Sequence, residues 1–450
     1  MNRNGFRERL ALGLNNHFFY GWVMLGVAAM VLLASGPGQS HTISVFVSIL
    51  MEDLGISATA VSFAYGFATL AAAFLLPFVG RQVDRHGMRK TALVVTVLFT
   101  LACVAFSQVT GTVISVFGIF EIAIWLTLGF GILRFLGQGA LLLNAVNLIS
   151  QWFSAKRGFA MGLMMLGFAA SMAIHPPLAQ WLIDQGDWRS AYVWLGVITA
   201  VLLLPGLMVL VFNKPEDLGL LPDGARPEVQ ESDTPKAAEF GLTLSEALRT
   251  STFYLVAIGL FCFAMLVTML HLFQISIFEA QGLSRELAAS IFPVSAVSMV
   301  ICMPLLGKML DRFRTEWIFA GGLAVMAAAL IAAGNVTDTT SGVIYGVIFG
   351  INNAVSMTFF GFMWPRYFGR RFIGSIQGTG QMIGVVGASL GPLPLGIAYD
   401  VTGDYTLTLI GFAAMPLAAM VLILLFLRDP KQLAAQETPD PNRRAASEKV

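Results

Sequence analysis

The sequence predicts an all-α membrane protein with twelve transmembrane helices in two pseudo-symmetric six-helix halves. Three observations support this fold class. Hydrophobic residues make up 56% of the 450 positions and charged residues only 12%, about half the charged share of a soluble domain. Apolar runs of the roughly 20 residues that a helix needs to cross a bilayer recur along nearly the whole chain. A segment of the chain is also repeated 227 positions later, as in membrane proteins built from repeats.

Hydropathy places the twelve helices between short polar breaks, and the tripeptide Gly36–Gly38 predicts a kink inside the first helix. The expected spans are 20–50, 58–82, 90–110, 118–150, 157–184, 189–213, 252–280, 286–308, 317–335, 341–366, 373–400 and 405–427.

The repeated segment is a short basic turn between two apolar runs. It reads GRQVDRHGMRK from Gly80 to Lys90, and its copy reads GKMLDRFRTEW from Gly307 to Trp317. The same offset superposes Gly55 on Gly282, Ser57 on Ser284 and Pro77 on Pro304. A second offset, 216, superposes Gly158 on Gly374, Gly162 on Gly378, Pro176 on Pro392 and Asp184 on Asp400. The two halves of the chain are therefore expected to share one helix order.

The distribution of basic residues predicts the orientation. With both termini in the cytoplasm, only Arg189 and Arg285 of the 27 Lys and Arg residues fall outside and only Arg134 falls within a span, as the positive-inside rule requires. We expect a protein of the plasma (inner) membrane. Its predicted parts are a cytoplasmic N-terminal segment 1–19, a half 20–213, a cytoplasmic linker 214–251, a half 252–427 and a cytoplasmic tail 428–450.

The linker is polar and ends in a pattern that starts a helix. Thr243 and Glu246 have the spacing of a capping box, which predicts a short surface helix before the second half.

Several classes of protein are excluded by composition and by missing motifs. A net charge of +1 argues against a nucleic-acid partner. The three cysteines lie inside apolar runs, so a disulfide framework is not expected, and the polar N-terminus is not a signal peptide. The sequence contains no Walker loop, haem pattern or metal-ligand cluster. We therefore expect neither an enzyme nor an ATP-driven pump, and no cofactor or metal.

The basic turn is similar to the loop between helices 2 and 3 of the major facilitator superfamily, whose pattern is G-x-x-x-D-R-x-G-R-R/K. The first copy matches it at Gly80, Asp84, Arg85, Gly87 and Arg89, and the second at Gly307, Asp311 and Arg312. Shorter segments resemble the monocarboxylate and oxalate:formate transporter branch, namely Phe19–Trp22, Arg134–Gly139, Gln151–Gly158 and Asp400–Tyr405. The resemblance implies the major facilitator fold and transport of a small solute.

One departure from that branch concerns the solute. The branch typically carries an aspartate and an arginine in helix 8, four residues apart, just before a proline. Counted back from Pro304, these positions are Met299 and Met303 in this chain. The anion-binding arginine of the branch is therefore missing, which puts its usual chemistry in doubt.

The two basic turns predict a cytoplasmic gate. Asp84 and Asp311 are placed to accept hydrogen bonds from a neighbouring helix N-terminus, where the helix dipole favours negative charge. The adjacent arginines are expected to reach across the interface between the halves. The simpler alternative is that these turns only retain positive charge inside. The expected gate residues are Gly80, Asp84, Arg85, Gly87, Arg89, Gly307, Asp311 and Arg312.

Ionisable and polar residues inside the spans are the candidates for solute binding or coupling, because a charge in the bilayer costs roughly 2.5–3.5 kcal/mol. Arg134 is the only base in a span, and we expect it either to brace helix 1 or to act on solute or proton. His175 takes the place of Gly391 in the other half, which predicts a wider or more polar contact there. For the neutral candidates, hydrogen bonding between helices is the alternative. The candidates are Arg134, His41, His175, His271, Asn352, Asn353, Gln381 and Glu121.

Together these features predict a secondary active transporter that moves a small organic solute, preferably a carboxylate, by alternating access. Protons are one candidate for the coupling ion, through the histidines or Glu121, while an exchanger or a facilitator needs none. One alternative is efflux of apolar or zwitterionic compounds, since the chain has 35 Phe and 21 Met residues. Another is a transporter-derived membrane sensor. The expected partners are the solute and the lipid bilayer, and the functional unit is expected to be a monomer.

Overall fold

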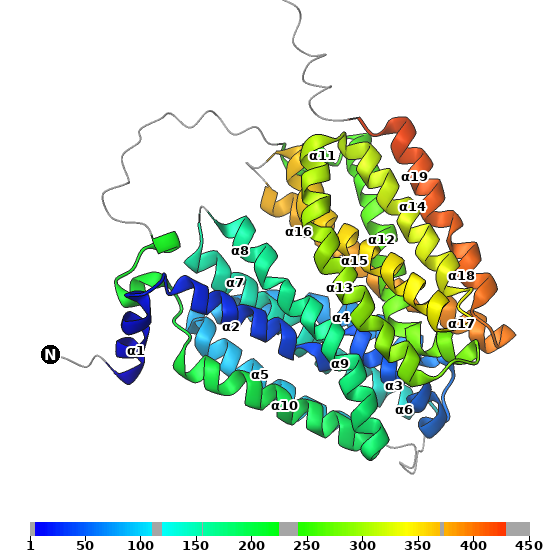
Figure 1. Cartoon of the computed structure of the whole chain (residues 1–450), viewed down its shortest axis with the longest axis horizontal. Coiled ribbons are helices and arrows are strands. Elements are labelled where there is room, and N and C mark those ends of the chain that lie inside the picture. The colour runs from blue at the N-terminus through cyan, green and yellow to red at the C-terminus, as the bar shows by residue number, and fades with distance from the viewer. Residues whose placement is uncertain (1–4, 110–118, 155, 225–241, 370–372, 429–450) are drawn as a thin grey trace, which may run out of the picture.

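The computed structural model describes residues 5–109, 119–154, 156–224, 242–369 and 373–428, and this part of the chain is almost entirely helical (Figure 1). The first half contains α1 (Phe6–Asn15), α2 (Gly21–Ala34), η1 (Gly36–Gly38), α3 (Ser40–Leu54), α4 (Ala58–His86), α5 (Met88–Phe106), α6 (Ile119–Leu133), η2 (Arg134–Leu141), α7 (Leu142–Trp152), α8 (Arg157–Met164), α9 (Leu166–Gln185) and α10 (Trp188–Val209). The linker region contains η3 (Pro215–Leu218), η4 (Pro222–Gly224) and α11 (Leu244–Ala247). The second half contains α12 (Ser251–Ala280), α13 (Arg285–Arg312), α14 (Thr315–Ala333), α15 (Thr339–Phe368), α16 (Ile373–Leu390), α17 (Pro392–Thr402), α18 (Thr406–Phe412) and α19 (Ala414–Phe426).

The predicted fold class is confirmed. Eleven segments of the described residues are long and apolar enough to cross a membrane. The remaining predicted span, 20–50, is the first along the chain and is divided, because the turn η1 separates the shorter apolar helix α2 from α3. The predicted kink at Gly36–Gly38 is thus a complete break. The start of the predicted span 118–150 falls partly outside the described residues.

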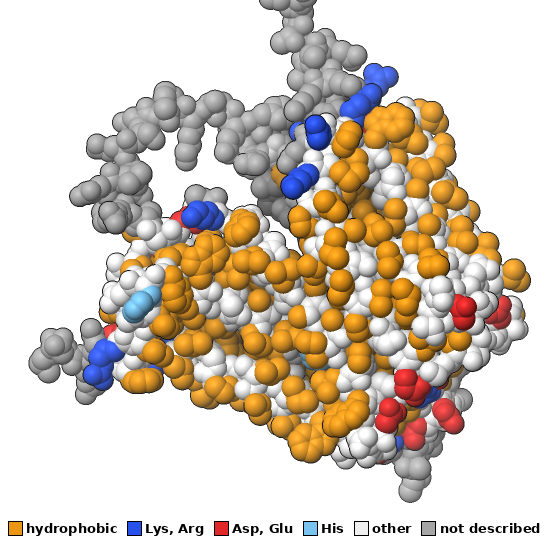
Figure 2. All heavy atoms as spheres, in the orientation of Figure 1, with side chains coloured by type: hydrophobic (Ala, Val, Ile, Leu, Met, Phe, Trp, Pro, Cys, Tyr) orange, Lys and Arg blue, Asp and Glu red, His pale blue; other side chains and the backbone are white. Residues whose placement is uncertain are grey.

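The two halves diverge like the arms of a V (Figure 1). We call the end of the molecule that carries His86 and α11 the linker end, and the end that carries Gly55 and Gly282 the far end. Across the halves, α3 packs against α12, α9 against α13, and α4 against both α16 and α17. Figure 2 shows hydrophobic side chains spread over the sides of both arms, with charged side chains gathered near the ends. This is the surface expected of a protein surrounded by lipid.

The sequence repeat is visible as repeated local geometry. Gly55 and Gly282 both have a left-handed backbone, with φ of +62° and +79°, and each lies before a long helix. Ser57 and Ser284 then cap those helices, since their side chains accept hydrogen bonds from the backbone N–H three residues on, at 3.1 and 3.2 Å. The duplicated residues therefore perform the same structural task in both halves.

The break in helix 1 has no counterpart in the other half, where α12 is continuous. Pro37 of η1 has no N–H to donate within a helix, which accounts for the break locally. The packing beside the break also differs between the halves, because the His175 ring lies against Gly36 of η1, whereas Gly391 lies against the backbone carbonyl of Met265 in α12.

Gly38 is the glycine of η1 whose missing side chain would meet a neighbouring backbone. A Cβ atom there would lie 2.4 Å from the carbonyl oxygen of Leu133, a backbone atom that cannot rotate away. We expect Gly38→Ala to destabilise the protein by about 1–3 kcal/mol, the usual cost of overpacking. The measurement is the unfolding temperature of the detergent-purified protein. Gly26→Ala on α2 is the matched control, because nothing lies within 4 Å of a Cβ there, and an equal loss in both variants would contradict the prediction.

The predicted capping box before the second half is confirmed. Thr243 Oγ1 accepts a hydrogen bond from the Glu246 backbone N–H at 3.3 Å, and the Glu246 carboxylate accepts one from the Thr243 N–H at 2.8 Å. The hydrogen bonds from Thr243 hold the pKa of Glu246 below its usual value. The box begins α11, the short helix expected at this point.

Candidate functional site

Arg134 lies at the start of η2, a π-helical stretch between α6 and α7, and is only 2% exposed. Wide turns of this kind occur often at functional sites. Its Nη1 donates hydrogen bonds to the hydroxyl of Tyr65 on α4 and, at 3.3 Å, to Ser40 Oγ on α3. The guanidinium also stands over the Tyr65 ring, 4.4 Å from its centroid. Arg134 therefore joins helices 1, 2 and 4 of the first half.

No carboxylate balances the Arg134 charge among the described residues. The ion pairs found there are Arg189–Asp53, Arg285–Glu279 and Arg314–Glu316, and Arg134 Nε is buried without a hydrogen-bond partner. The Glu121 side chain lies outside the described residues. The partners of Arg134 are neutral hydroxyls.

Three histidines form a chain close to Arg134, starting from the neighbour of Ser40. His41 Nε2 lies 3.2 Å from Ser171 Oγ, which is 3.3 Å from His175 Nδ1. His271 of α12 completes the group from the other half, with its ring centroid 6.2 Å from that of His41. All three rings are at most 5% exposed. The structure therefore brings together the three histidines that the sequence singles out.

Further buried polar groups extend this cluster along α15. Phe349 packs on the His271 ring with a centroid distance of 4.7 Å, and Asn352 lies one turn further on the same helix face. Asn352 is fully buried, and neither of its amide atoms has a hydrogen-bond partner among the described residues. Asn353 donates at 2.9 Å to the Phe349 carbonyl. Gln381, in contrast, is an exposed residue of α16 and lies outside this buried group.

The residues of the predicted gate lie at the linker end, where the hydrogen bonds of Arg89 to described residues stay within its own half. It donates to the Leu207 and Met208 carbonyls at the end of α10, at 3.3 and 2.7 Å. Arg85 and Arg312 are exposed. The side chains of Asp84 and Asp311 lie outside the described residues. A gate across the two halves therefore stays a prediction.

The remaining gate residues are glycines. Gly87 has a φ of +79° and lies against the Asn213 side chain, whose Oδ1 accepts a hydrogen bond from the Arg89 N–H at 3.0 Å. Open space surrounds Gly80 and Gly307. In this conformation the first turn therefore serves to attach α5 to the end of α10.

The hydrogen bonds that cross the halves lie instead toward the far end. The Asp400 carboxylate of α17 accepts the backbone N–H groups of Ala58 and Thr59 at 3.0 and 2.8 Å, at the N-terminus of α4. Arg285 donates to Ser48 Oγ at 3.0 Å. A helix N-terminus favours negative charge. Asp400 thus makes, at the far end, the kind of contact that the sequence predicts for Asp84 and Asp311.

We expect Asp400→Asn to open the far end more often, because an amide keeps one acceptor but loses the charge that the helix dipole favours. A loss of about 1–2 kcal/mol would shift the populations of the two conformations roughly five- to thirty-fold. Spin labels at Glu52 and Ala280, residues at the ends of α3 and α12, would report the change as a longer distance. Asp404→Asn is the control, since Asp404 bonds only within its own turn. Equal distance distributions in both variants would show that the hydrogen bonds of Asp400 to the N-terminus of α4 do not hold the far end closed.

Tyr65 and Ser40 are functional-site residues that are not among the sequence candidates. A signal for Tyr65 was present in the repeat, because the 227-residue offset pairs it with Phe292. The second half therefore lacks the hydroxyl that contacts Arg134. Ser40 carries no comparable signal, since a serine in a transmembrane helix is common.

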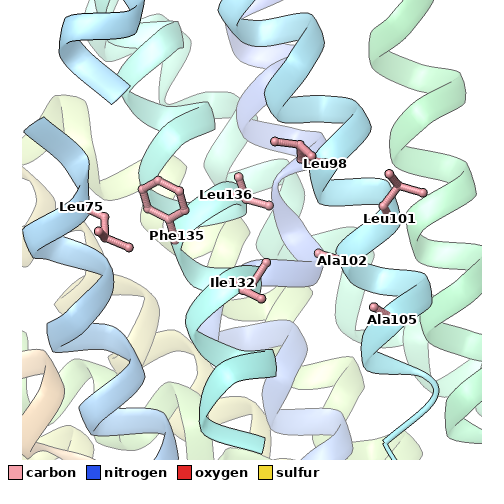
Figure 3. Close-up of a pocket in the computed structure, with 8 residues that line it drawn as sticks. All are labelled: Leu75, Leu98, Leu101, Ala102, Ala105, Ile132, Phe135 and Leu136. Carbon is pink, nitrogen blue, oxygen red and sulfur yellow. The ribbon is translucent and has the colours of Figure 1, made fainter. Parts of the chain in front are cut away.

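Two cavities of the described residues bear on the candidate site. The first, of about 490 Å³, lies on the outside of the first half and is lined by apolar side chains from α4, α5, α6 and η2 (Figure 3). Leu75, Leu101 and Ile132 of its lining are about half exposed on that surface, so acyl chains of the bilayer are its natural filling. The second, of about 260 Å³, is polar and lies at the far end between the halves.

The sequence of this helical protein matches a family model over residues 23–392 and again over 275–448, and the description of that family is Major Facilitator Superfamily. The chain belongs to the Major Facilitator Superfamily. It is accordingly a membrane transporter and not an enzyme. The predicted resemblance is confirmed at the level of the superfamily and extends to the monocarboxylate and oxalate:formate branch in the relatives that follow.

Among the relatives of this major facilitator protein is monocarboxylate transporter 2 of Homo sapiens, which is 22% identical over 94% of this chain and 89% of its own length. The oxalate:formate antiporter of Oxalobacter formigenes is 23% identical over 70% of this chain and 69% of its own. A crystal structure of a D-xylose-proton symporter superposes with a TM-score of 0.69 at 14% identity, covering 91% of this chain and 98% of the other. At that identity the superposition supports the fold alone.

Proposed function

We propose that this major facilitator protein is a secondary active transporter that carries a small organic anion of the carboxylate class by alternating access. Arg134 is the observation that carries the proposal. Its charge is buried, and the described residues surround it with hydroxyl groups and no acid. A carboxylate solute supplies both the missing negative charge and acceptors that match the guanidinium in shape.

The departure in helix 8 agrees with this role of Arg134. Met299 is 1% exposed and Met303 packs against the hydrophobic core, so α13 offers neither the acid nor the base that the related branch carries at these two positions. The base of this chain is in the first half, on η2. We infer that the anion site has moved between the halves, while the names of the matched monocarboxylate and oxalate:formate relatives support a solute of the same class.

We infer that protons drive this transport. The rings of His41 and His271 face each other across the two halves, and histidine is the side chain that gains and loses a proton most readily near neutral pH. Two charged rings 6.2 Å apart would repel by about 3 kcal/mol at an effective dielectric constant of 20. A second proton therefore favours a conformation in which α3 and α12 separate. Proton binding is in this way linked to the movement of the halves.

The proposed location is the inner membrane, with the linker end in the cytoplasm. The distribution of Lys and Arg supports this orientation. In that case the two arms of the V diverge toward the cytoplasm, while Asp400 and Arg285 hold the far end closed (Figure 1). We propose that the protein works as a monomer, because each major facilitator chain contains both halves that alternating access requires.

The proposal is tested by a thermal-shift screen of the purified protein against small organic acids and hydrophobic amines. We expect carboxylates to raise the unfolding temperature of the wild type and to leave that of Arg134→Ala unchanged. A ligand that binds only the native state stabilises it by an amount that grows with the logarithm of its concentration relative to Kd. Stabilisation by amines alone would contradict the proposal.

A further inference from the structure

A stripe of polar side chains runs along α3 on the side that faces α12. It consists of His41, Ser44, Ser48 and Glu52. Spacings of three, four and four residues place these side chains on one face of a helix, each about 5–6 Å from the next. The stripe connects the buried pair of His41, at the start of α3, and His271 with the far end of the molecule.

The two serines of the stripe contact the second half. Ser44 is fully buried, and its Oγ accepts a hydrogen bond from the Ile275 backbone N–H of α12 at 3.3 Å. Ser48 Oγ accepts one from Arg285, which is paired with Glu279. The stripe therefore follows the seam between the halves.

The stripe ends in the polar cavity at the far end. This cavity has a volume of about 260 Å³, and Ser48, Glu52, Ser276, Glu279, Arg285 and Tyr405 contribute to its lining. Its size suffices for several water molecules, each of which occupies about 30 Å³ in the liquid. Ser276 and Tyr405 interact with each other in this lining. Together with Glu52, Glu279 and Arg285 they give the cavity the polar walls that bound water requires.

We propose that this stripe is the route by which protons pass between the far-end cavity and the His41–His271 pair. The inference rests on the proposed proton-coupled function. Simple bonding between helices explains each serine singly. It does not explain why acid, hydroxyl, hydroxyl and imidazole follow one another on one helix face and lead to a water-sized polar cavity. Chains of acid and histidine side chains are the usual proton relays of membrane proteins.

The transfer balances without any other reactant. A proton leaves a hydronium ion in the cavity for the carboxylate of Glu52, which is exposed and forms no ion pair among the described residues. It then passes along the Ser48 and Ser44 hydroxyls and intervening water to an imidazole nitrogen of His41 or His271. After the halves have moved, the imidazolium releases it to water on the linker side, and no electrons are exchanged.

Several charged and titratable groups of the described residues surround the two ends of this route, and Asp400 acts on Tyr405 from the edge of the cavity. His41 faces His271 and His175. At the cavity, Glu279 faces Arg285, while Glu52, Tyr399 and Tyr405 share the lining. Since Glu279 is paired with Arg285, Glu52 is the acid of this lining that has no ion-pair partner among the described residues, and we assign it as the proton acceptor.

The test compares Ser44→Val with Ser44→Thr, two side chains of nearly equal volume of which only threonine has a hydroxyl. Both variants are reconstituted into liposomes with a pH-sensitive dye. We expect Ser44→Val to lose uptake driven by a pH gradient and the accompanying pH change, and Ser44→Thr to keep both. Solute counterflow, which needs no net proton movement, should be equal in the two. The same pair at Ser48, a half-exposed position, serves if the buried site tolerates neither side chain.

The outcomes separate the route from the proposed function. Proton-driven uptake that survives in both valine variants would overturn the route and leave proton-coupled transport standing. A wild type that shows counterflow but no proton-driven uptake would overturn proton coupling and the route together. A wild type without carboxylate counterflow would overturn the proposed function itself.

Discussion

Arg134→Ala is expected to reduce carboxylate uptake more than any other single change in this protein. Removing one partner of a desolvated, hydrogen-bonded charge pair costs about 2–5 kcal/mol of binding, which corresponds to a loss of roughly 30-fold to several thousand-fold in affinity. The measurements are the initial rate of uptake into proteoliposomes and the solute Kd by calorimetry. We expect both to change together, because the solute loses the one Lys or Arg side chain that is buried among the described residues.

The stability of the solute-free protein decides between the two interpretations of Arg134. A buried charge without an acid costs roughly 2.5–3.5 kcal/mol in a membrane helix. If the arginine is kept for the solute, Arg134→Ala has an unfolding temperature equal to that of the wild type or higher. If it mainly braces helix 1 through Ser40, the unfolding temperature falls. A fall in stability that accounts for the lost uptake would contradict the anion role.

Tyr65→Phe is the matched control for this prediction. It removes the hydroxyl that accepts from Arg134 but keeps the ring beneath the guanidinium. The loss of one hydrogen bond to a charged group costs about 1.5–3 kcal/mol, and water or the solute can replace the hydroxyl. We therefore expect a smaller decrease in uptake than for Arg134→Ala, with the charge still available to the anion. Equal losses of uptake in the two variants would indicate that uptake depends on the position in which Tyr65 holds the guanidinium, and not on the Arg134 charge alone.

The fold could be predicted from the sequence because lipid allows few solutions. Every backbone polar group in the bilayer must be satisfied within its own segment, so long apolar runs predict helices and their ends. The break at Gly36–Gly38 could be predicted as a kink but not as a complete separation of α2 from α3. The ring of His175, which is distant in the sequence, lies beside Gly36 at this break, and only the structure shows that contact.

The candidate site could be predicted only in part. Arg134 and the histidines stand out because charged and titratable side chains are rare in membrane spans. Their neutral partners do not, since Ser40, Ser171 and Tyr65 resemble many other residues of the chain until the helices are packed. The hydrogen bonds between the halves at the far end could not be predicted from the sequence either. Asp400 belongs to a motif at the end of helix 11, and only the structure shows its carboxylate on the first N–H groups of α4.

Replacing His41 and His271 together by glutamine is expected to uncouple transport from the pH gradient. Glutamine keeps a polar side chain of similar length but takes up no proton near neutral pH. Uptake driven by a pH gradient should be lost in the double variant, while counterflow of the solute continues because Arg134 is intact. The measurements are labelled-solute uptake and the internal pH of proteoliposomes, followed in parallel.

The single variants sharpen this expectation. If the repulsion between two charged rings links proton binding to movement of the halves, either His41→Gln or His271→Gln alone removes that repulsion and should already abolish the gradient's effect. His17→Gln, an exposed histidine at the end of α1, should behave as the wild type. Full proton-driven uptake in either single variant would contradict the paired role. It would leave one ring as the carrier, and the contact between α3 and α12 would then serve packing alone.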